Sequence, residues 1–327
     1  MGTFASVTLA ATINIIIFLF ITSFDSQLSL SSSYAFDSES QYDHLAYGYN
    51  LLQKTILQQR SFKNETETNN PISFTVYHTD YSDSIMNVLK KHFSSPNTKN
   101  YLFEDTRAKA ILGNFSSEYN FIIVGTSYNE ITKNKFRIAK DYQFNSSDIV
   151  VYDIENRSTT PRYEKMDPVS SISQVMQTIR WEGYKAGITP DYEFITTYYK
   201  EIEWKNVDFL GIQIQRFTNN YELLLKWAAE ISSFVKSKNP NTEVFIQLSF
   251  RHASNCYDSE NNRGVDNACK IDVYKTLQVL KQNLSALAQL HTVDGFIISY
   301  PRHLCPAELC TPTNLDEIMV HIENIQR

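Results

Sequence analysis

Three consecutive segments decide the fold: Asp148-Ile-Val-Val-Tyr-Asp-Ile-Glu155, residues 168–181, and Lys185-Ala-Gly-Ile-Thr-Pro190. The outer two are short and apolar and are expected to be buried strands. The middle one has the signature of a helix, because Asp167 is a suitable N-cap and Pro168 suits the first helical position. Its apolar positions recur at helical spacing: Val169, Ile172, Val175, Met176 and Ile179. A helix between two strands is the repeating unit of a parallel sheet.

The same alternation continues in both directions. Further strands are expected at 72–77, 121–125, 207–215, 243–249 and 293–300. Apolar stripes of helical period lie between them, with Asn220 and Thr313 as expected N-caps. The segment 101–103 is either an eighth strand or a helix, and we favour the helix.

This order of elements predicts an α/β fold, a (β/α)8 TIM-type barrel that is complete or lacks one strand, over residues 71–327. Its length is close to the usual size of about 250 residues. A doubly wound open sheet is the alternative, although its nucleotide-binding forms need a G-x-G-x-x-G turn that is absent here. With 9 glycines in 327 residues, Gly-rich phosphate loops are disfavoured and no cofactor is expected.

The N-terminal segment 1–35 contains one charged residue, Asp25, and is largely apolar from Val7 to Phe24. It is either a signal peptide, with small residues before a cleavage site after Ala35, or an uncleaved membrane anchor; a buried helix is a third alternative. The first two predict a secreted or membrane-anchored protein with an extracellular domain. Residues 36–70 are expected to form a helix at 41–60 followed by a linker.

Four cysteines agree with an extracellular location. The simplest pairing is Cys256 with Cys269 and Cys305 with Cys310, although three connectivities are open. Zinc is the competing explanation, but no C-x2-C element is present, and we expect no metal site there. Acidic residues near Gly264 resemble a calcium loop with the glycine one position late, so a solvated loop closed by a disulfide is expected.

The charge balance limits the class of partner. The isoelectric point is near 5.7 and there is no basic block, so nucleic acid is not an expected partner. We expect carbohydrate or another extracellular ligand, with membrane contact only through the N-terminal segment.

Polar side chains are expected to gather where the strands end. In 149–155, Val150, Tyr152 and Ile154 would face helices, which leaves Asp153 and Glu155 pointing inward at the carboxyl end. That end carries the active site in barrels of this type. The expected ligand contacts are Tyr77, Gln213, Gln215, Gln247, Arg251 and Tyr300. A structural alternative is that the acids only pair with Arg216, Arg251 or Arg302.

Two carboxylates at positions i and i+2 of a strand stand roughly 6.5–7 Å apart. Their repulsion favours a form in which one keeps its proton near neutral pH and serves as a general acid. Glu155, nearer the strand end, is the expected proton donor, and Asp153 the group that orients or stabilises.

The segment Asp148-Ile-Val-Val-Tyr-Asp153-Ile-Glu155 resembles the D-x-x-D-x-D-x-E strand motif of chitinase-type glycoside hydrolases of family 18. In that family the final Glu is the acid, and the preceding Asp positions the substrate acetamido group that acts as nucleophile. The resemblance implies those roles for Glu155 and Asp153. Val151 stands where the motif has its second Asp, and Tyr300 where the family commonly has Trp.

Two hypotheses follow from the sequence. The first is an extracellular barrel that hydrolyses a polysaccharide by acid/base catalysis. The second is a catalytically inactive cell-surface barrel that binds glycan or a protein partner, which the departures at Val151 and Tyr300 favour. A glycan on the Asn156 sequon, next to Glu155, would crowd the proposed site and argue against it.

Overall fold

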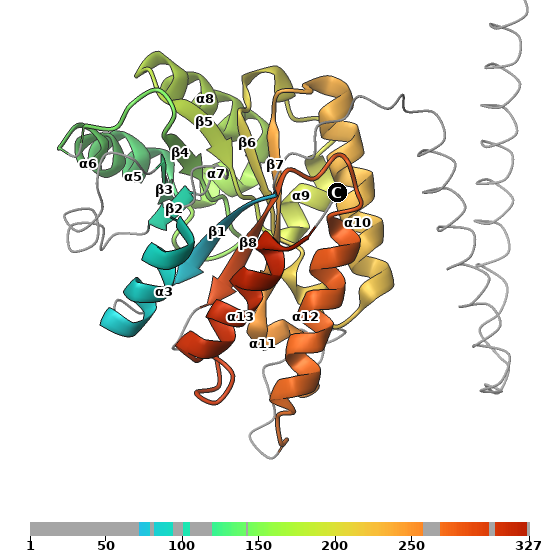
Figure 1. Ribbon diagram of the computed structural model, residues 1–327. Helices are drawn as coiled ribbons and strands as arrows, with labels where there is room; N and C mark the ends of the chain where they lie inside the picture. The colour runs from blue at the N-terminus through green and yellow to red at the C-terminus, as the bar shows by residue number, and fades with distance from the viewer. Residues whose placement is uncertain are drawn as a thin grey trace, which may run out of the picture. The chain divides into compact units, whose positions relative to one another are not determined.

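The computed structural model describes residues 72–78, 82–93, 101–104, 120–141, 143–257, 269–300 and 305–325 (Figure 1). All described residues belong to one compact unit, 69–327. The expected apolar segment, the helix at 41–60 and the calcium-like loop around Gly264 lie outside the described residues.

Eight parallel strands of the described residues form a closed barrel in chain order. They are β1 (Ser73–His78), β2 (Tyr101–Glu104), β3 (Asn120–Gly125), β4 (Ile149–Tyr152), β5 (Lys185–Ile188), β6 (Phe209–Ile212), β7 (Glu243–Ser249) and β8 (Gly295–Tyr300). The ring closes between β1 and β8, where Ser73 is opposite Gly295 and His78 is opposite Tyr300. The TIM-type barrel is therefore confirmed, in its complete form.

The helix favoured for 101–103 is wrong, because these residues form β2. The strand pairs with β1 on one side and with β3 on the other, so it fills the gap between them. Periodicity cannot separate a strand from a helix in so short an apolar run, and the backbone pairing on both sides decides it.

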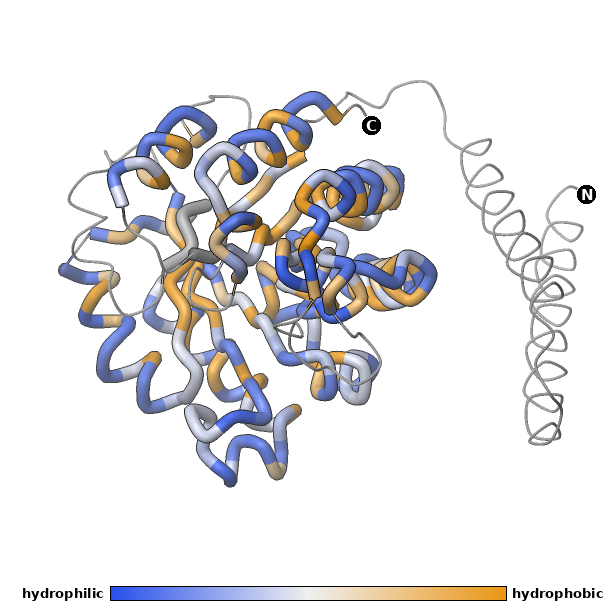
Figure 2. The backbone as a smooth tube through the Cα atoms, turned by 90° about the horizontal axis from the view of Figure 1, so that it is seen from below, coloured by the Kyte–Doolittle hydropathy of each residue, from blue (hydrophilic) through white to orange (hydrophobic). Residues whose placement is uncertain are grey.

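Helices connect the strands on the outside of the ring. They are α3 (Asp83–Phe93), α5 (Tyr128–Glu130), the π-helix η1 (Ile131–Lys135), α6 (Phe136–Asp141), α7 (Arg162–Met166), α8 (Pro168–Trp181), α9 (Tyr192–Tyr198), η2 (Trp204–Asn206), η3 (Gln215–Phe217), α10 (Tyr221–Lys238), α11 (Phe250–Ala253), α12 (Val273–Leu287) and α13 (Pro312–Glu323). Along the helices, hydrophobic and hydrophilic residues alternate, as amphipathic helices require (Figure 2).

The N-caps agree with the sequence in two of three cases. Asp167 accepts a hydrogen bond from the Ser170 N–H, and Asn220 caps α10. The last helix is capped by Thr311, which accepts from the Asn314 N–H, and not by Thr313. Pro312 is the reason, because proline suits the first helical position and the cap is then the residue before it.

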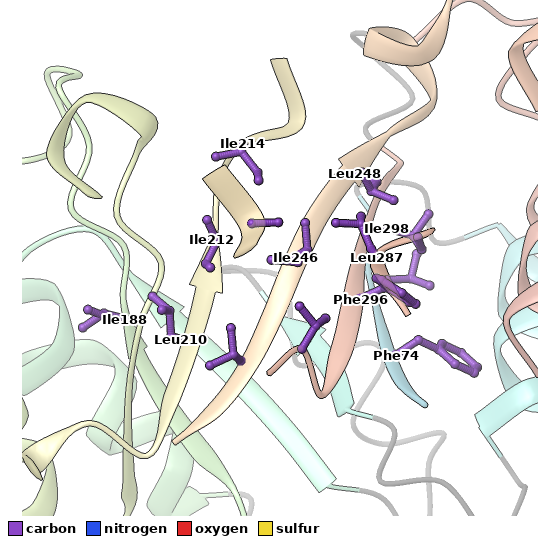
Figure 3. Packing of buried hydrophobic residues seen from close by; sticks show 14 of the residues in the cluster. Phe74, Ile188, Leu210, Ile212, Ile214, Ile246, Leu248, Leu287, Phe296 and Ile298 are labelled. Atoms are coloured by element: carbon purple, nitrogen blue, oxygen red, sulfur yellow. The ribbon is translucent and has the colours of Figure 1, made fainter. Parts of the chain in front are cut away.

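Side chains of alternate strand residues form two separate cores. The outer cluster packs between strands and helices, as Leu210, Ile212 and Ile246 do in Figure 3. A smaller cluster fills the inside of the barrel: Ile122, Val124, Ile149, Val151, Phe209, Phe245 and Ile297. The alternation expected for 149–155 is thus present, with Val150 and Tyr152 outside and Val151 inside.

Two disulfides join neighbouring cysteines. Cys256 pairs with Cys269 and Cys305 with Cys310, with Cα–Cα distances of 5.7 and 5.9 Å. The simplest of the three connectivities is therefore correct. Such bonds are typical of extracellular proteins. Across the described ranges, no helix combines the length and apolar character that a bilayer crossing requires.

Candidate functional site

Asp153 and Glu155 lie directly beyond β4, at the carboxyl end of the barrel. The backbone N–H of Asp153 donates to the carbonyl of Gly125 at the end of β3, over 2.9 Å. Val151 closes the inner core below it. The two acids therefore follow the last buried layer of the barrel, as the strand alternation predicts.

The carboxylate of Asp153 is held from two neighbouring strand ends. Its Oδ1 accepts a hydrogen bond from the hydroxyl of Thr189, after β5, at 3.1 Å, and one from Gln213 Nε2, after β6, at 2.7 Å. Gln213 Nε2 also donates to the Thr189 carbonyl at 2.6 Å. The other oxygen, Oδ2, has no hydrogen bond within the described part of the chain and remains available to a ligand.

Gly211 allows this arrangement. A Cβ on residue 211 would lie 2.5 Å from the Thr189 methyl group and 2.7 Å from Ile297 Cδ1. Real Cβ atoms essentially never approach other heavy atoms so closely, because the packing is already dense. Thr189 can therefore reach Asp153 only because position 211 has no side chain.

Glu155 is 9% exposed, and its closest charged partner is Arg157, with Oε2 3.4 Å from the guanidinium Nε. The Arg157 side chain is 75% exposed, so the pair is open to solvent on one side. Of the three arginines considered from the sequence, Arg302 lies outside the described residues, and neither Arg216 nor Arg251 pairs with Glu155 in the part of the chain that the structure describes. Arg216 pairs instead with Glu193 at 2.9 Å and lies over the ring of Tyr192.

A third acid, Asp191, stands beside the pair, and sequence reasoning did not select it. It caps α9 by accepting from the Phe194 N–H, and its Oδ2 accepts from the Asn156 N–H at 2.6 Å. Asp after a strand and before a helix is a common N-cap, so nothing in the local pattern distinguishes Asp191 from a purely structural residue. It fixes the backbone immediately after Glu155.

Burial raises the pKa of all three carboxyl groups, and a neighbouring carboxylate adds to the rise at each of them. For Asp153, desolvation is the main cause and the nearby charge of Glu155 adds to it, against the hydrogen bond from Thr189. Burial also raises the pKa of Glu155, with Arg157 opposing and Asp191 adding. Desolvation raises the pKa of Asp191. The cluster therefore keeps a proton to a higher pH than isolated carboxylic acids would.

A chain of hydrogen bonds fixes the backbone of Glu155 from the side of β3. Its N–H donates to the hydroxyl of Thr160 at 3.1 Å, and that hydroxyl donates to the carbonyl of Thr126 at 2.9 Å. Glu130 accepts from both the N–H and the hydroxyl of Thr126, and it pairs with the fully buried Lys135 at 3.2 Å. This network reaches the π-helix η1. No motif or periodic pattern in the sequence predicted it.

The other expected contacts are placed as follows. Gln215 Nε2 lies 3.4 Å from Gln213 Oε1. Gln247 is opposite the inward-facing Ile297. Arg251 lies in α11, beyond the strand end, so strand alternation does not set its direction. Tyr77 is opposite Ser299 in the sheet, and its side chain lies outside the described residues.

Tyr300 does not lie where a ligand contact is expected. It is 1% exposed, belongs to the outer cluster and meets Phe250 edge to face at 5.5 Å. The reason is strand alternation, because Tyr300 shares its face with Phe296 and Ile298. Ser299 is the inward residue at this level.

Asn156 is exposed beside Glu155. Within the described ranges, no group of three or more His, Cys, Asp or Glu side chains is arranged to hold a metal ion.

No protein-family model matches the sequence, and no curated protein sequence matches it. Solved structures similar to the chain include a GH128 subgroup III curdlan-specific exo-β-1,3-glucanase from Blastomyces gilchristii, crystallised with glucose. It is 10% identical, with 78% of this chain and 98% of the other covered and a TM-score of 0.49.

The GH18 chitinase ChiB from Flavobacterium johnsoniae is 10% identical, with 77% and 94% covered and a TM-score of 0.42. 3-Keto-L-gulonate-6-phosphate decarboxylase from Vibrio cholerae is 8% identical, with 78% and 99% covered and a TM-score of 0.40. The barrel fold is shared by enzymes of different chemistry, so these similarities concern architecture alone.

Proposed function

We propose that this chain is an extracellular glycoside-hydrolase-like barrel that acts on a polysaccharide by acid/base catalysis, with Glu155 as proton donor and Asp153 as its partner. One observation carries the proposal. Two carboxyl groups follow the same strand at the carboxyl end of the barrel, and burial raises the pKa of both; the charge of Glu155 adds to the rise at Asp153, and that of Asp191 adds to the rise at Glu155. Clustered acids with raised pKa values are a recurrent feature of catalytic sites.

In this mechanism the carboxyl proton of Glu155 passes to the glycosidic oxygen as the bond from that oxygen to the anomeric carbon breaks. The electron pair of the broken bond stays on the departing oxygen, which leaves as a hydroxyl group, while an oxygen of a neighbouring substrate group bonds to the anomeric carbon. Water then displaces that oxygen and returns a proton to Glu155, which completes the hydrolysis. Asp153 orients a polar group of the substrate through Oδ2, while Thr189 and Gln213 hold Oδ1. The resemblance to family 18 suggests that this group is a substrate acetamide.

The disulfides support an extracellular site of action, because such bonds persist in oxidising compartments. The apolar start of the sequence supports export or anchoring in the same way. An extracellular polysaccharide is the substrate class that suits both features.

A second candidate is a barrel that binds glycan without turning it over. Val151, where the resembling motif has an acid, is fully buried in the inner core, so no carboxylate stands below Asp153 on β4. The hydrogen bonds to Asp153 also suit a purely structural role. These observations favour binding without catalysis.

Turnover of aminosugar and uronic-acid polymers by wild type and Glu155→Gln decides between the two. We expect the substitution to reduce kcat by about 10²–10⁴-fold with little change in KM, because general acid catalysis contributes about that much. The matched control is Glu201→Gln, at an exposed glutamate after the end of α9, and it should keep full activity. Equal turnover by wild type and Glu155→Gln would show that Glu155 is not the proton donor. Binding without turnover by the wild type would establish the second candidate.

A further inference from the structure

Two buried polar atoms at the ends of β6 and β7 have no hydrogen-bond partner within the described part of the chain. They are Gln215 Oε1 and His252 Nδ1. Leaving a buried polar group unpaired costs about 1–3 kcal/mol, and native proteins rarely do so without a functional reason. Both residues keep partial exposure, so a turn of either side chain would bring its buried atom to a ligand.

The two residues belong to segments that touch. Gln215 begins η3, His252 lies in α11, and η3 packs against both α11 and β7. Asn219 Nδ2 donates to the Tyr257 carbonyl at 2.8 Å and ties the two segments together. The ring of His252 stands edge-on to Tyr257, with centroids 4.3 Å apart.

The place where η3 meets α11 adjoins Asp153 and Glu155. Gln215 Nε2 points to Gln213 Oε1 at 3.4 Å, and Gln213 Nε2 donates to Asp153 at 2.7 Å. Only one side chain therefore separates Gln215 from Asp153. A ligand with a polar group on Asp153 would extend past Gln213 to reach Gln215 and His252.

We propose that Gln215 and His252 form a subsite for a neutral sugar ring, whose hydroxyl group donates a hydrogen bond to Gln215 Oε1 and whose further hydroxyl pairs with His252 Nδ1. An amide oxygen accepts only, so its partner must carry a hydrogen to donate. A sugar hydroxyl does, whereas a carboxylate or sulfate group does not. A uronic acid ring keeps its hydroxyl groups, so the subsite favours neutral rings where the carboxylate would otherwise face these two atoms.

Two positive charges lie near this subsite, those of Arg251 and Arg216, and that of Arg216 is already engaged. Burial, with the charges of Arg251 and Arg216, lowers the pKa of His252 to about 3, so the imidazole is neutral at physiological pH. Arg216 already pairs with Glu193 and stacks over Tyr192, which leaves less of its charge for an anionic ligand. A neutral imidazole offers one acceptor and one donor, which suits a hydroxyl.

The inference rests on the proposed function for its substrate class, but binding tests it without turnover. Calorimetric titration of Glu155→Gln with chitotetraose and cellotetraose, both neutral, and with tetragalacturonate, which is anionic, measures the selection directly. We expect a neutral tetramer to bind at least tenfold more tightly than tetragalacturonate. In the same background, Gln215→Leu and His252→Phe should each weaken its binding about tenfold.

Stability separates a lost contact from a damaged fold. Removing an unpaired buried polar atom should leave the melting temperature of Gln215→Leu unchanged or higher. Gln174→Leu, at an exposed glutamine of α8, is the matched control and should bind as the parent does. Tighter binding of tetragalacturonate, binding that is indifferent to both substitutions, or no binding of any tetramer at millimolar concentration would each overturn the subsite. Neutral-selective binding lost in the two variants, with no turnover by the wild type, would keep the subsite and reject the hydrolase.

Discussion

Asp153 accepts two hydrogen bonds on one carboxylate oxygen, and its other oxygen has no donor among the residues that the structure describes. Such a group can hold a proton on Oδ2 without losing either bond. Its raised pKa has a consequence for stability, because the folded protein binds this proton more tightly than the unfolded chain does. Between the ordinary aspartate pKa of about 3.9 and the raised value, the free energy of unfolding must therefore fall as the pH rises.

Asp153→Asn tests this linkage at the scale of one residue. The asparagine oxygen can still accept from Thr189 and Gln213, but it cannot titrate. We expect the variant to match the wild type near pH 3.5 and to become the more stable of the two as the pH rises. Their free energies should diverge by up to about 1.4 kcal/mol per pH unit within the window. Denaturant unfolding from pH 3.5 to 8 measures it.

Asp141→Asn, at the exposed end of α6, is the control and should run parallel to the wild type. A constant difference between Asp153→Asn and wild type across the whole pH range would show that burial of Asp153 carries no protonation cost.

At this scale the sequence predicted the face of each strand residue and little about contacts between distant segments. Strand alternation placed Asp153 and Glu155 together and also indicates that Tyr300 faces outward. Asp191 and His252 were beyond prediction, because their roles depend on which loops meet at the rim. No periodic pattern encodes such a meeting.

The elements themselves followed from the sequence where they are long and periodic. The apolar faces of α8 and α10 and their N-cap residues could be predicted. Each face follows from helical periodicity, and each N-cap bonds to a backbone N–H only three residues away. The strand β2 was not, because it has four residues and its pairing partners lie on other segments. The π-helix is likewise fixed by packing, since Gly125 lies against Ile131 and Lys135.

The cap of α13 gives a prediction at the scale of one element. Thr311→Ala removes the side-chain oxygen that accepts from the Asn314 N–H, so the free energy of unfolding should fall by about 1 kcal/mol. Thr313→Ala, two residues later and exposed, should change it by less than about 0.5 kcal/mol. Thermal or denaturant unfolding of the pair compares them directly. A larger loss in Thr313→Ala would place the cap at the residue that the sequence favoured.

For the whole molecule, the sequence predicted a barrel because strands and helices alternate, and it could not show that the ring closes. Closure depends on the pairing of β1 with β8, between residues more than 200 positions apart. The helices behind those two strands are joined as well. His92 of α3 lies between two carboxylates of α13, with Nε2 2.6 Å from Asp316 and Nδ1 2.9 Å from Glu323.

Removing this bridge should weaken the entire barrel. His92 is almost fully buried, so His92→Ala leaves a gap and two neighbouring carboxylates without it. We expect a loss of about 1–3 kcal/mol in the free energy of unfolding. This is less than the loss on breaking a fully buried ion pair, because Asp316 and Glu323 are one-third exposed. Lys91→Ala, which removes a 57% exposed partner of Asp316, should cost less than about 1 kcal/mol. Equal losses in the two variants would contradict a special role for His92.

The position of β8 also bears on how the protein is made. It is the last strand in chain order, yet it alone joins β7 to β1. While the ribosome is still adding the residues before β8, the sheet has two unpaired edges, and such edges recruit other chains. A nascent chain stalled before residue 295 should therefore bind holding chaperones and aggregate when released, whereas a chain extended through β8 has no open edge left to protect.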